Sequence, residues 1–276
     1  MSYAVRVNPG SKVDLASIDP NANGGLNKDE GEARIAELAK ELDELEDLMF
    51  FAGKHSMLLV LQGMDTSGKD GTIRFLFQHM NAPSAKVASF KVPTPIERAH
   101  DFLWRVHSQT PGAGEWVIFN RSHYEDVLVV RVHELVPKSV WSRRYDHINA
   151  FEAVVAEANT IIVKCFLHID KDEQEARLLA REQEVEKSWK LSVGDWKERE
   201  FWDDYQAAYE DALSKCSTEI AAWHVIPANR KWFRNLAILE LLVETLRPYQ
   251  AGWLESLEAL GESAKAELAE YKATLT

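Results

Sequence analysis

The residues whose types and spacing point most clearly to chemistry run from Gly63 to Lys69, GMDTSGK, and fit the pattern G-x-x-x-x-G-K. An apolar run at 57–61 precedes them and is typical of a strand buried on both faces, and residues 70–74 can open a helix. In this context the backbone N–H groups of the loop point at an anion, the helix N-terminus adds positive charge, and Lys69 reaches the outer phosphates. The pattern predicts a phosphate-binding P-loop. The alternative is a tight strand-to-helix turn with a chance lysine.

Two acids in and beside this loop predict a metal ion. Asp65 lies inside the loop, where its carboxylate would repel a phosphate unless a cation lay between them. Asp70 follows the lysine, at a position where P-loops usually carry a Ser or Thr whose hydroxyl holds Mg²⁺. We expect Asp65 to hold part of a Mg²⁺ site, in which Mn²⁺ can substitute. Asp70 is either a second metal contact or a first-turn acid that favours the helix dipole.

A second polar cluster, residues 120–126 (NRSHYED), follows the strand expected at 115–119. Ligands bind at the carboxyl ends of strands in open α/β sheets, so this cluster belongs beside the P-loop. In P-loop proteins an acid at the end of a neighbouring strand holds the metal or its water, but that position here is Asn120. Arg121 follows it and can bridge a phosphate in transfer. The alternative is a polar loop with solvated charges.

A basic, tryptophan-containing turn lies between two expected helices at about 171–200. The first helix, capped from Asp170, carries Arg177 and Arg181, and the turn is followed by a second helix start at 192–195. Such a pair resembles a lid that closes over a phosphate donor or acceptor. Exposed helices routinely carry basic residues, so a solvated face is the alternative.

The elements that must position these residues alternate along the chain. Strands are expected at 57–61, 86–90, 115–119, 160–167 and 222–227. Helices are expected at 28–51, from the P-loop to about Met80, at 98–107 after a capping box of Thr94, Pro95 and Glu97, at 139–157, after Asp170, and at 232–246. This order predicts a three-layer α/β/α P-loop kinase fold with a five-stranded parallel sheet and a helical lid. The expected domains are an N-terminal arm and helix at 1–51, a core at 52–248, and a C-terminal helix at 249–276.

Two helices carry apolar stripes that suit packing on the body or on a partner. The stripes are Ile35, Leu38, Leu42, Leu45 and Met49, and Trp253, Leu257, Leu260, Ala264, Leu268, Tyr271 and Leu275. They make a homo-oligomer, a dimer or a tetramer, a reasonable expectation.

The composition narrows the class of protein. The net charge of -12 argues against general nucleic-acid binding. Residues 54–144 nevertheless carry 12 Lys and Arg against 8 Asp and Glu, which suits a focused site for a polyanion. No apolar run approaches the roughly 20 residues needed to span a bilayer, so no membrane association is expected. Cys165 and Cys216 lie in an expected core strand and at a helix end, which is typical of a cytoplasmic protein.

With these motifs in place, the chain resembles the polyphosphate kinase 2 family, P-loop kinases that move phosphate between inorganic polyphosphate and nucleotides. The likeness runs from about Leu45 to about Leu246. It lies in the segments GMDTSGKDGTIR, SFKVPTP, HDFLWRVH, FNRSHYEDVLVVRVH, LHIDKDEQEARLLAREQEVEKSWKLS, DWKEREFWDDYQAAY and WHVIPANRKWFRNLA. The P-loop alone covers a vast superfamily, whereas the set together is specific.

The resemblance implies roles for matching residues. Asp65 and Lys69 would hold metal and phosphates, Arg121 would contact the phosphate in flight, and Arg181 in the lid would stabilise transition-state charge with Asp195 in support. Asp65 and Glu125 would be the metal ligands. Other expected phosphate or nucleotide contacts are Gly63, Met64, Thr66, Ser67, Gly68, Asp70, Gly71, Asn120, Tyr124 and Asp126, and candidates for a polyphosphate channel are Lys91, Arg98, Arg105, Arg131, His133, Arg143, Arg144, Lys187 and Lys190.

Two departures from the family pattern bear on the subtype. Many members have Asp at the position of Asn120, which shifts metal binding toward Asp65 and toward Glu125 or Asp126. Glu125 stands where the narrower ADP- or GDP-forming members carry Asn, and this resembles the subgroup that phosphorylates both mono- and diphosphates. The implied substrates are inorganic polyphosphate with AMP and ADP, with ATP as product or reverse substrate and GMP and GDP as further acceptors. The alternatives are an ATP-dependent kinase of the thymidylate-kinase type and a non-enzymatic polyphosphate- or nucleotide-binding regulator.

Overall fold

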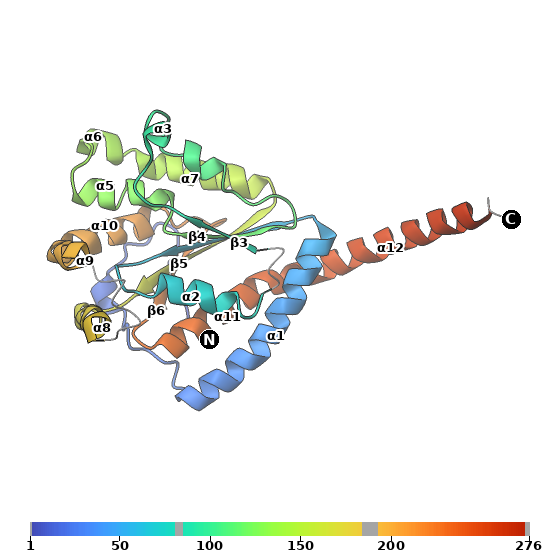
Figure 1. Ribbon diagram of the computed structural model, residues 1–276, viewed down its shortest axis with the longest axis horizontal. Helices are drawn as coiled ribbons and strands as arrows, with labels where there is room; N and C mark the ends of the chain where they lie inside the picture. Colours follow the sequence, from blue (N-terminus) through green and yellow to red (C-terminus); the bar gives the residue numbers. More distant parts are fainter. Residues whose placement is uncertain (1, 81–84, 184–192, 274–276) are drawn as a thin grey trace.

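A six-stranded sheet lies at the centre of the computed structural model, which describes residues 2–80, 85–183 and 193–273 (Figure 1). The strand order is β1-β6-β5-β2-β4-β3. The strands are β1 (Val5–Arg6), β2 (Ser56–Gln62), β3 (Ala85–Ser89), β4 (Trp116–Asn120), β5 (Thr160–His168) and β6 (Trp223–Pro227). Strands β2 to β6 are all parallel to one another, as the alternation with helices predicted.

The count of five strands was one too low. The N-terminal arm adds β1 to the edge of the sheet, antiparallel to β6, with Val5 opposite Val225 and Arg6 opposite His224. Two residues are too short a run to show a period of two, so the sequence pattern carries no signal for this strand.

The two central strands position the P-loop. Every residue of β2 and β5 is buried, because helices cover both faces of the sheet there. In β2, Leu61 pairs with Asn120 at the end of β4 and with Cys165 of β5. The parallel register therefore brings the P-loop and the polar cluster at 120–126 to one edge of the sheet.

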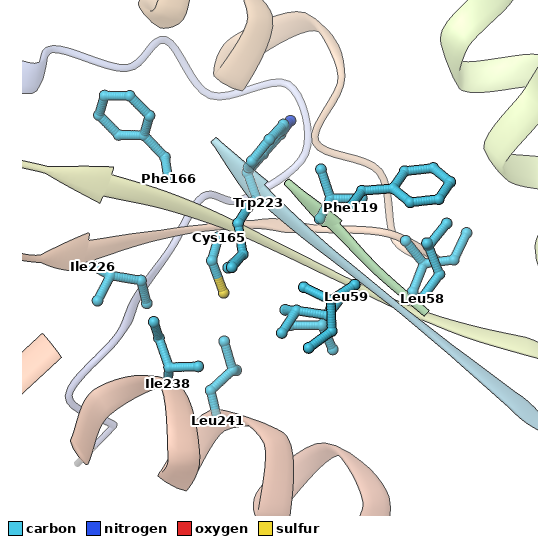
Figure 2. Close-up of a cluster of buried hydrophobic side chains, with 14 of the residues drawn as sticks. Leu58, Leu59, Phe119, Cys165, Phe166, Trp223, Ile226, Ile238 and Leu241 are labelled. Carbon is cyan, nitrogen blue, oxygen red and sulfur yellow. The ribbon is translucent and has the colours of Figure 1, made fainter. Parts of the chain in front are cut away.

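Helices form a layer on each face of the sheet (Figure 1). One face is covered by α2 (Lys69–Leu76) and α11 (Lys231–Leu246), and α1 (Lys28–Ala52) packs along α11. On this side Ile238 and Leu241 of α11 point toward Cys165 and Ile226 of the sheet (Figure 2). The other face is covered by α5 (Val129–Val132), α6 (Lys138–Trp141), α7 (Arg144–Glu157) and α10 (Trp202–Lys215). The three-layer α/β/α architecture is confirmed.

Several expected helices are shorter or divided. The P-loop helix ends at Leu76 rather than near Met80. The helix expected at 98–107 is two short helices, α3 (Pro95–Arg98) and α4 (Trp104–His107), because the Asp101 carboxylate accepts a hydrogen bond from the Leu103 N–H and begins a new turn. The helix expected at 139–157 is likewise divided into α6 and α7. The capping box of Thr94 and Glu97 is present as expected.

The remaining elements lie at the ends of the layers. These are α8 (Lys171–Gln183), α9 (Val193–Glu198), α12 (Gln250–Ala273) and the short 3-10 helices η1 (Leu15–Ser17), η2 (His123–Asp126), η4 (Arg199–Phe201) and η5 (Arg247–Tyr249). Helix α12 projects away from the body (Figure 1). Across the described ranges, none of the helices combines the length and apolar character that crossing a membrane requires. Cys165 and Cys216 are buried and free, as expected of core residues.

Candidate active site

The P-loop joins β2 to α2, and its glycines stand where other residues would be strained. Gly63 has φ +153° and Gly68 has φ +106°. A Cβ at Gly68 would lie 2.0 Å from the Arg234 Nη1, and one at Gly63 would lie 2.7 Å from the Leu167 carbonyl oxygen. Both positions therefore require glycine, as the G-x-x-x-x-G-K pattern implies.

Two arginines from distant elements hold the loop in place. Arg177 of α8 donates from its Nη1 to the carbonyl oxygens of Thr66 (2.9 Å) and Ser67 (3.0 Å). Its Nη2 donates to the carbonyl oxygens of Ala228 (2.7 Å) and Asn229 (2.9 Å), beyond the end of β6. Arg234 of α11 is buried beside Gly68, and burial together with nearby Arg177 lowers the pKa of Arg234 to about 10. The carbonyl oxygens of Thr66 and Ser67 thus point to Arg177, and the opposite side of the loop is available to an anion.

Lys69 begins α2 and folds back over the loop. Its Nζ donates to the carbonyl oxygens of Gly63 (2.7 Å) and Met64 (3.2 Å). Burial lowers the pKa of Lys69, while the nearby Asp65 carboxylate opposes that change. Lys69 also lines the cleft that the P-loop borders.

Asp65 faces a cation supplied by the chain itself. Arg121 Nη2 donates to Asp65 Oδ1 at 2.8 Å, which joins the P-loop to the residue after β4. Burial opposes the charge of Arg121, but Glu125 and Asp65 outweigh it and raise the pKa of the guanidinium. The backbone of Arg121 has φ +61°, a left-handed conformation that is uncommon for non-glycine residues and is enriched at functional sites. Beside this pair, Asn120 Nδ2 donates to Asp70 Oδ1 at 2.8 Å.

A cleft of about 610 Å³ opens over these residues. Its lining combines P-loop residues with side chains from β3, β4 and α8, and the predicted site residues among them are Asp65, Thr66, Gly68, Lys69, Asp70, Gly71, Lys91, Asn120, Arg121 and Arg181. The cleft is large enough for several phosphate groups.

The Asp65–Arg121 pair separates this cleft from a small cavity of about 40 Å³. The small cavity is lined by Gly63, Met64, Asp65, Arg121, Glu125, Gln174, Glu198, Tyr205 and Tyr209. Glu125 Oε1 accepts from Gln62 Nε2 at 3.1 Å, and its Oε2 lies 3.7 Å from Arg121 Nη1. Burial raises the pKa of Glu125, although Arg121 and Lys69 oppose that change. Glu125 is therefore a largely buried carboxylate that lies directly behind the arginine.

The arginine predicted in the lid also lies at the cleft. Arg181 of α8 lines it and donates from Nη1 to Asp195 Oδ2 of α9 at 2.7 Å. Burial and the nearby Asp65 raise the pKa of Asp195, while Arg181 opposes them. The contact joins α9 to α8 beside the cleft. The role of Asp195 in supporting the lid region stays a prediction.

The residues around the cleft fit a magnesium ion. The Thr66 hydroxyl is buried without a hydrogen-bond partner among the described residues, and Asp65 and Asp70 line the same cleft as Thr66. Within the described ranges no three His, Cys, Asp or Glu side chains form a cage for a metal. Mg²⁺ bound with phosphates keeps several waters and takes only one or two carboxylates, so this set suits a metal that arrives with a phosphorylated ligand.

Other predicted residues lie away from the cleft. Tyr124 is a correction, because it is fully buried and its hydroxyl donates to Glu152 Oε1 at 2.8 Å in the core. Three more predicted residues pair with other side chains of the protein: Asp126 with Arg144 at 2.7 Å, Arg131 with Asp211 at 2.6 Å, and His133 with Glu198 at 2.9 Å. Their charged or polar groups are therefore bonded within the protein.

The remaining channel candidates differ in their setting. Arg105 donates to the Lys91 carbonyl oxygen at 2.8 Å and lines a neighbouring hollow together with Lys91. Arg98 is exposed on α3, and Arg143 borders a groove between α4 and α7. Lys187 and Lys190 lie outside the described residues.

Sequence reasoning missed the residues that support the loop from behind. Arg177, Arg234 and Gln174, whose Nε2 donates to the Asp65 carbonyl oxygen, were not among the predicted site residues. Arg177 precedes Arg181 by four residues and so shares its face of the helix, and that spacing was the available signal. Arg234 lies far along the chain, and no local pattern relates it to the P-loop.

Comparisons with known proteins identify the family of the chain. The family model of polyphosphate kinase 2 (PPK2) matches residues 25–251. A relative from Meiothermus ruber, named AMP/ADP-polyphosphate phosphotransferase, is 51% identical over 243 residues, which cover 87% of this chain and 91% of the relative. An ADP-polyphosphate phosphotransferase from Rhodopseudomonas palustris is 39% identical over 270 residues, with 92% of each chain covered. The crystal structure of polyphosphate kinase 2 from Arthrobacter aurescens TC1 superimposes with a TM-score of 0.86 at 44% identity, covering 89% of this chain and 88% of that one. The chain belongs to the polyphosphate kinase 2 family.

Proposed function

We propose that this protein transfers the terminal phosphate of inorganic polyphosphate to AMP and to ADP, reversibly, with GMP and GDP as further acceptors. Its family makes it a polyphosphate–nucleotide phosphotransferase, and the relative from Meiothermus ruber, whose name includes both AMP and ADP, supports this choice of acceptors. The observation that carries the proposal is the convergence of Lys69, Arg121 and Arg181 on one cleft beside the P-loop.

The chemistry of phosphoryl transfer explains this arrangement. Transfer requires the protein to position the attacking and leaving oxygens in line and to place cations around the charge that spreads over the phosphoryl group. The P-loop N–H groups and Lys69 bind one phosphate chain. Arg121 contacts the phosphoryl group in transfer after its hydrogen bond to Asp65 is replaced by one to phosphate. Arg181 adds its charge from α8 as the proposed lid, α8 and α9, closes. When bound, Mg²⁺ held by Asp65, with Glu125 nearby, neutralises phosphate oxygens and orients them.

A product assay tests the reaction. The protein is incubated with Mg²⁺ and each of AMP, ADP, GMP and GDP, with either polyphosphate or ATP as donor. ADP from AMP and ATP from ADP, formed with polyphosphate, is the expected result. Product formed only from ATP would favour a kinase of the thymidylate-kinase type. Tight binding of polyphosphate without product over hours would favour a regulator.

The oligomeric state and the location also remain proposals. The free, buried cysteines support a cytoplasmic location. We propose that a second copy of the chain covers the projecting part of α12. Trp253 and Ser256 are its buried residues, whereas Leu260 and Leu268 are 58% and 51% exposed. Trp253, Leu257 and Leu260 recur eleven residues later as Ala264, Leu268 and Tyr271, which keeps one apolar stripe along the helix.

The charges of α12 favour an antiparallel pair. Residues 254–263 carry three Glu and no Lys or Arg, whereas residues 264–273 carry both lysines of the helix. An antiparallel partner brings each acidic half beside a lysine-containing half, and a parallel partner brings acid beside acid. Light scattering of the full chain tests the pair. L260E with L268E is expected to lower the mass to that of the monomer, whereas A259E with A266E, on the opposite face, leaves it unchanged. A monomeric wild type would refute the pairing.

A further inference from the structure

A lysine in the middle of the sheet has no explanation in the fold alone. Lys164 lies in β5, paired with Val60 of β2 on one side and Trp223 of β6 on the other, and it is fully buried. Its three donors are all used, by Glu152 Oε2 at 2.6 Å, the Tyr124 hydroxyl at 2.9 Å and the Cys216 carbonyl oxygen at 2.6 Å. A buried ion pair rarely stabilises a fold more than apolar residues of the same size would, so stability alone does not explain the Lys164–Glu152 pair.

The partner carboxylate binds the segment that carries two residues of the active site. Glu152 of α7 is 1% exposed, and its Oε1 accepts from the Tyr124 hydroxyl at 2.8 Å and from His123 Nε2 at 3.2 Å. Burial disfavours the charge of Glu152, but Lys164 and His123 outweigh it and the pKa of the carboxyl is lowered. Glu152 is therefore an ionised acceptor held by three donors.

His123 and Tyr124 open η2, and Glu125 follows them directly. The two faces of this short helix have different partners. Its inner side chains bind Glu152, while Glu125 binds Gln62 and lies beside Arg121 at the small cavity. Ser122 strengthens the junction, because its Oγ accepts from both Gln62 Nε2 and the Tyr124 N–H. A shift of Tyr124 would thus move Glu125 and the strained backbone of Arg121.

The same lysine also binds the end of the helix that forms a second wall of the small cavity. The Cys216 carbonyl oxygen that it binds lies at the end of α10, and α10 carries Tyr205 and Tyr209, which line that cavity with Glu125. The ammonium therefore ties η2, α7 and α10 to the central strand at one point.

We propose that the Glu152–Lys164 pair, acting through the Tyr124 hydroxyl, is a positioning device for Arg121 and Glu125 in phosphoryl transfer. The proposal rests on the proposed function. None of the three residues touches substrate, since their exposed fractions are at most 1%. Their effect is on the placement of the cation and carboxylate, and so on the transition state rather than on ground-state binding.

Tyr124→Phe is the sharpest test, because it removes one hydroxyl and leaves the ring packed against Trp223. Lys164→Met would leave the Glu152 charge buried without its partner and would confuse folding with function. The matched control is Thr160→Val in the same strand, which also removes one buried hydroxyl, the one bonded to Ser56 at 2.9 Å at the far end of β5. Both variants are assayed with AMP and polyphosphate, and their melting temperatures are compared.

We expect Tyr124→Phe to lower kcat about ten- to a hundredfold, with KM for AMP and for polyphosphate changed by less than about twofold. Thr160→Val is expected to keep wild-type kcat despite a similar loss of melting temperature. A folded Tyr124→Phe variant with wild-type kcat, or an equal fall of kcat in Thr160→Val, would overturn the inference. An inactive wild type would instead refute the proposed function.

A double-mutant cycle with Glu125→Gln separates positioning from a general structural effect. If Tyr124 acts through η2, the double variant loses little more activity than the worse single variant. Losses in kcat that multiply would show that the two residues act independently, and would also overturn the inference.

Discussion

At the scale of single residues, the site depends on charges that are paired with one another before any phosphate is present. Asp65 and Arg121 are bonded at 2.8 Å, and the Lys69 ammonium is bonded to two carbonyl oxygens of its own loop. A phosphate chain competes for both cations. These contacts pre-form the site, and the cost of breaking them is offset by charge-assisted bonds to phosphate.

Removing the positive charge of Arg121 or of Lys69 should therefore abolish most of the activity and keep the fold unchanged. We expect Arg121→Ala and Lys69→Ala to lower turnover with AMP and polyphosphate by at least about a hundredfold, because each removes charge from the transition state. Thermal unfolding followed by circular dichroism checks that the fold persists. A variant with normal turnover would remove that residue from the mechanism.

The carboxylate behind Arg121 is expected to influence the choice of acceptor. Glu125→Asn should reduce turnover of AMP more than that of ADP, since Glu125 would organise metal or water beside the shorter acceptor. The measured quantity is the ratio of kcat/KM for the two nucleotides. Asp126→Asn is the control, because Asp126 pairs with Arg144 and does not line the cleft, so its ratio stays at the wild-type value. Equal losses on both acceptors in Glu125→Asn would contradict the assignment.

At the scale of elements, helix α8 contributes to the site twice. Its Arg181 lines the cleft, and its Arg177 holds the back of the P-loop and the turn after β6. Movement of α8 would therefore be felt both by the bound phosphate and by the loop that binds it. This coupling is a property of the helix, since the two arginines lie one turn apart.

The geometry of Arg177 cannot be reproduced by lysine. The guanidinium makes five hydrogen bonds in a fixed plane, counting one from Nε to Glu173, and an ammonium has only three donors on a flexible stem. We expect Arg177→Lys to lower the free energy of unfolding by about 2–4 kcal/mol and turnover by about tenfold or more. Urea denaturation and the AMP assay measure the two effects. Arg199→Lys, a variant of a neighbouring half-buried arginine that does not bond to the P-loop, is the comparison. If it matched Arg177→Lys in both assays, the special role of Arg177 would be refuted.

At the scale of the whole molecule, the N-terminal arm connects parts of the chain that are far apart in sequence. It adds β1 to β6 and bonds to α10 and α11, through the Leu15 N–H to Glu210 (2.9 Å) and the Tyr3 N–H to Glu240 (3.0 Å). Covering β6 also removes an exposed strand edge that could pair with other chains. The arm buries His224 of β6, whose Nδ1 has no hydrogen-bond partner among the described residues.

This burial predicts a pH dependence of stability. Desolvation, with a smaller contribution from Arg6, lowers the pKa of His224 to about 4, against 6.5 for the ordinary group. The unfolded chain therefore binds more protons than the native protein between pH 6.5 and 4, and stability falls as the pH falls through that window. The contribution is at most about 3 kcal/mol.

Urea denaturation at pH 7 and at pH 4.5 measures this effect. His224→Gln should lose less stability than the wild type between the two pH values, whereas the exposed His147→Gln should follow the wild type. Parallel losses in all three proteins would assign the acid sensitivity to other groups.

Local features of the sequence were sufficient for the P-loop, the five parallel strands and the polar cluster at 120–126. Each is determined by a few consecutive residues, because glycine spacing, apolar runs and turn chemistry act between residues that are close in sequence. The same reasoning placed Asn120 and Arg121 beside the loop, since parallel strands end at one edge of a sheet.

The tertiary structure alone decided which side chains of that cluster face the cleft. Asn120 and Arg121 do, whereas Glu125 lines the small cavity behind Arg121 and Tyr124 turns into the core toward Glu152. Nothing in the run NRSHYED marks that division. It also decided that Arg177 and Arg234 support the loop, and that two residues of the arm form a strand. These contacts join residues more than 100 positions apart, where strand register and packing set the neighbours and no local spacing encodes them.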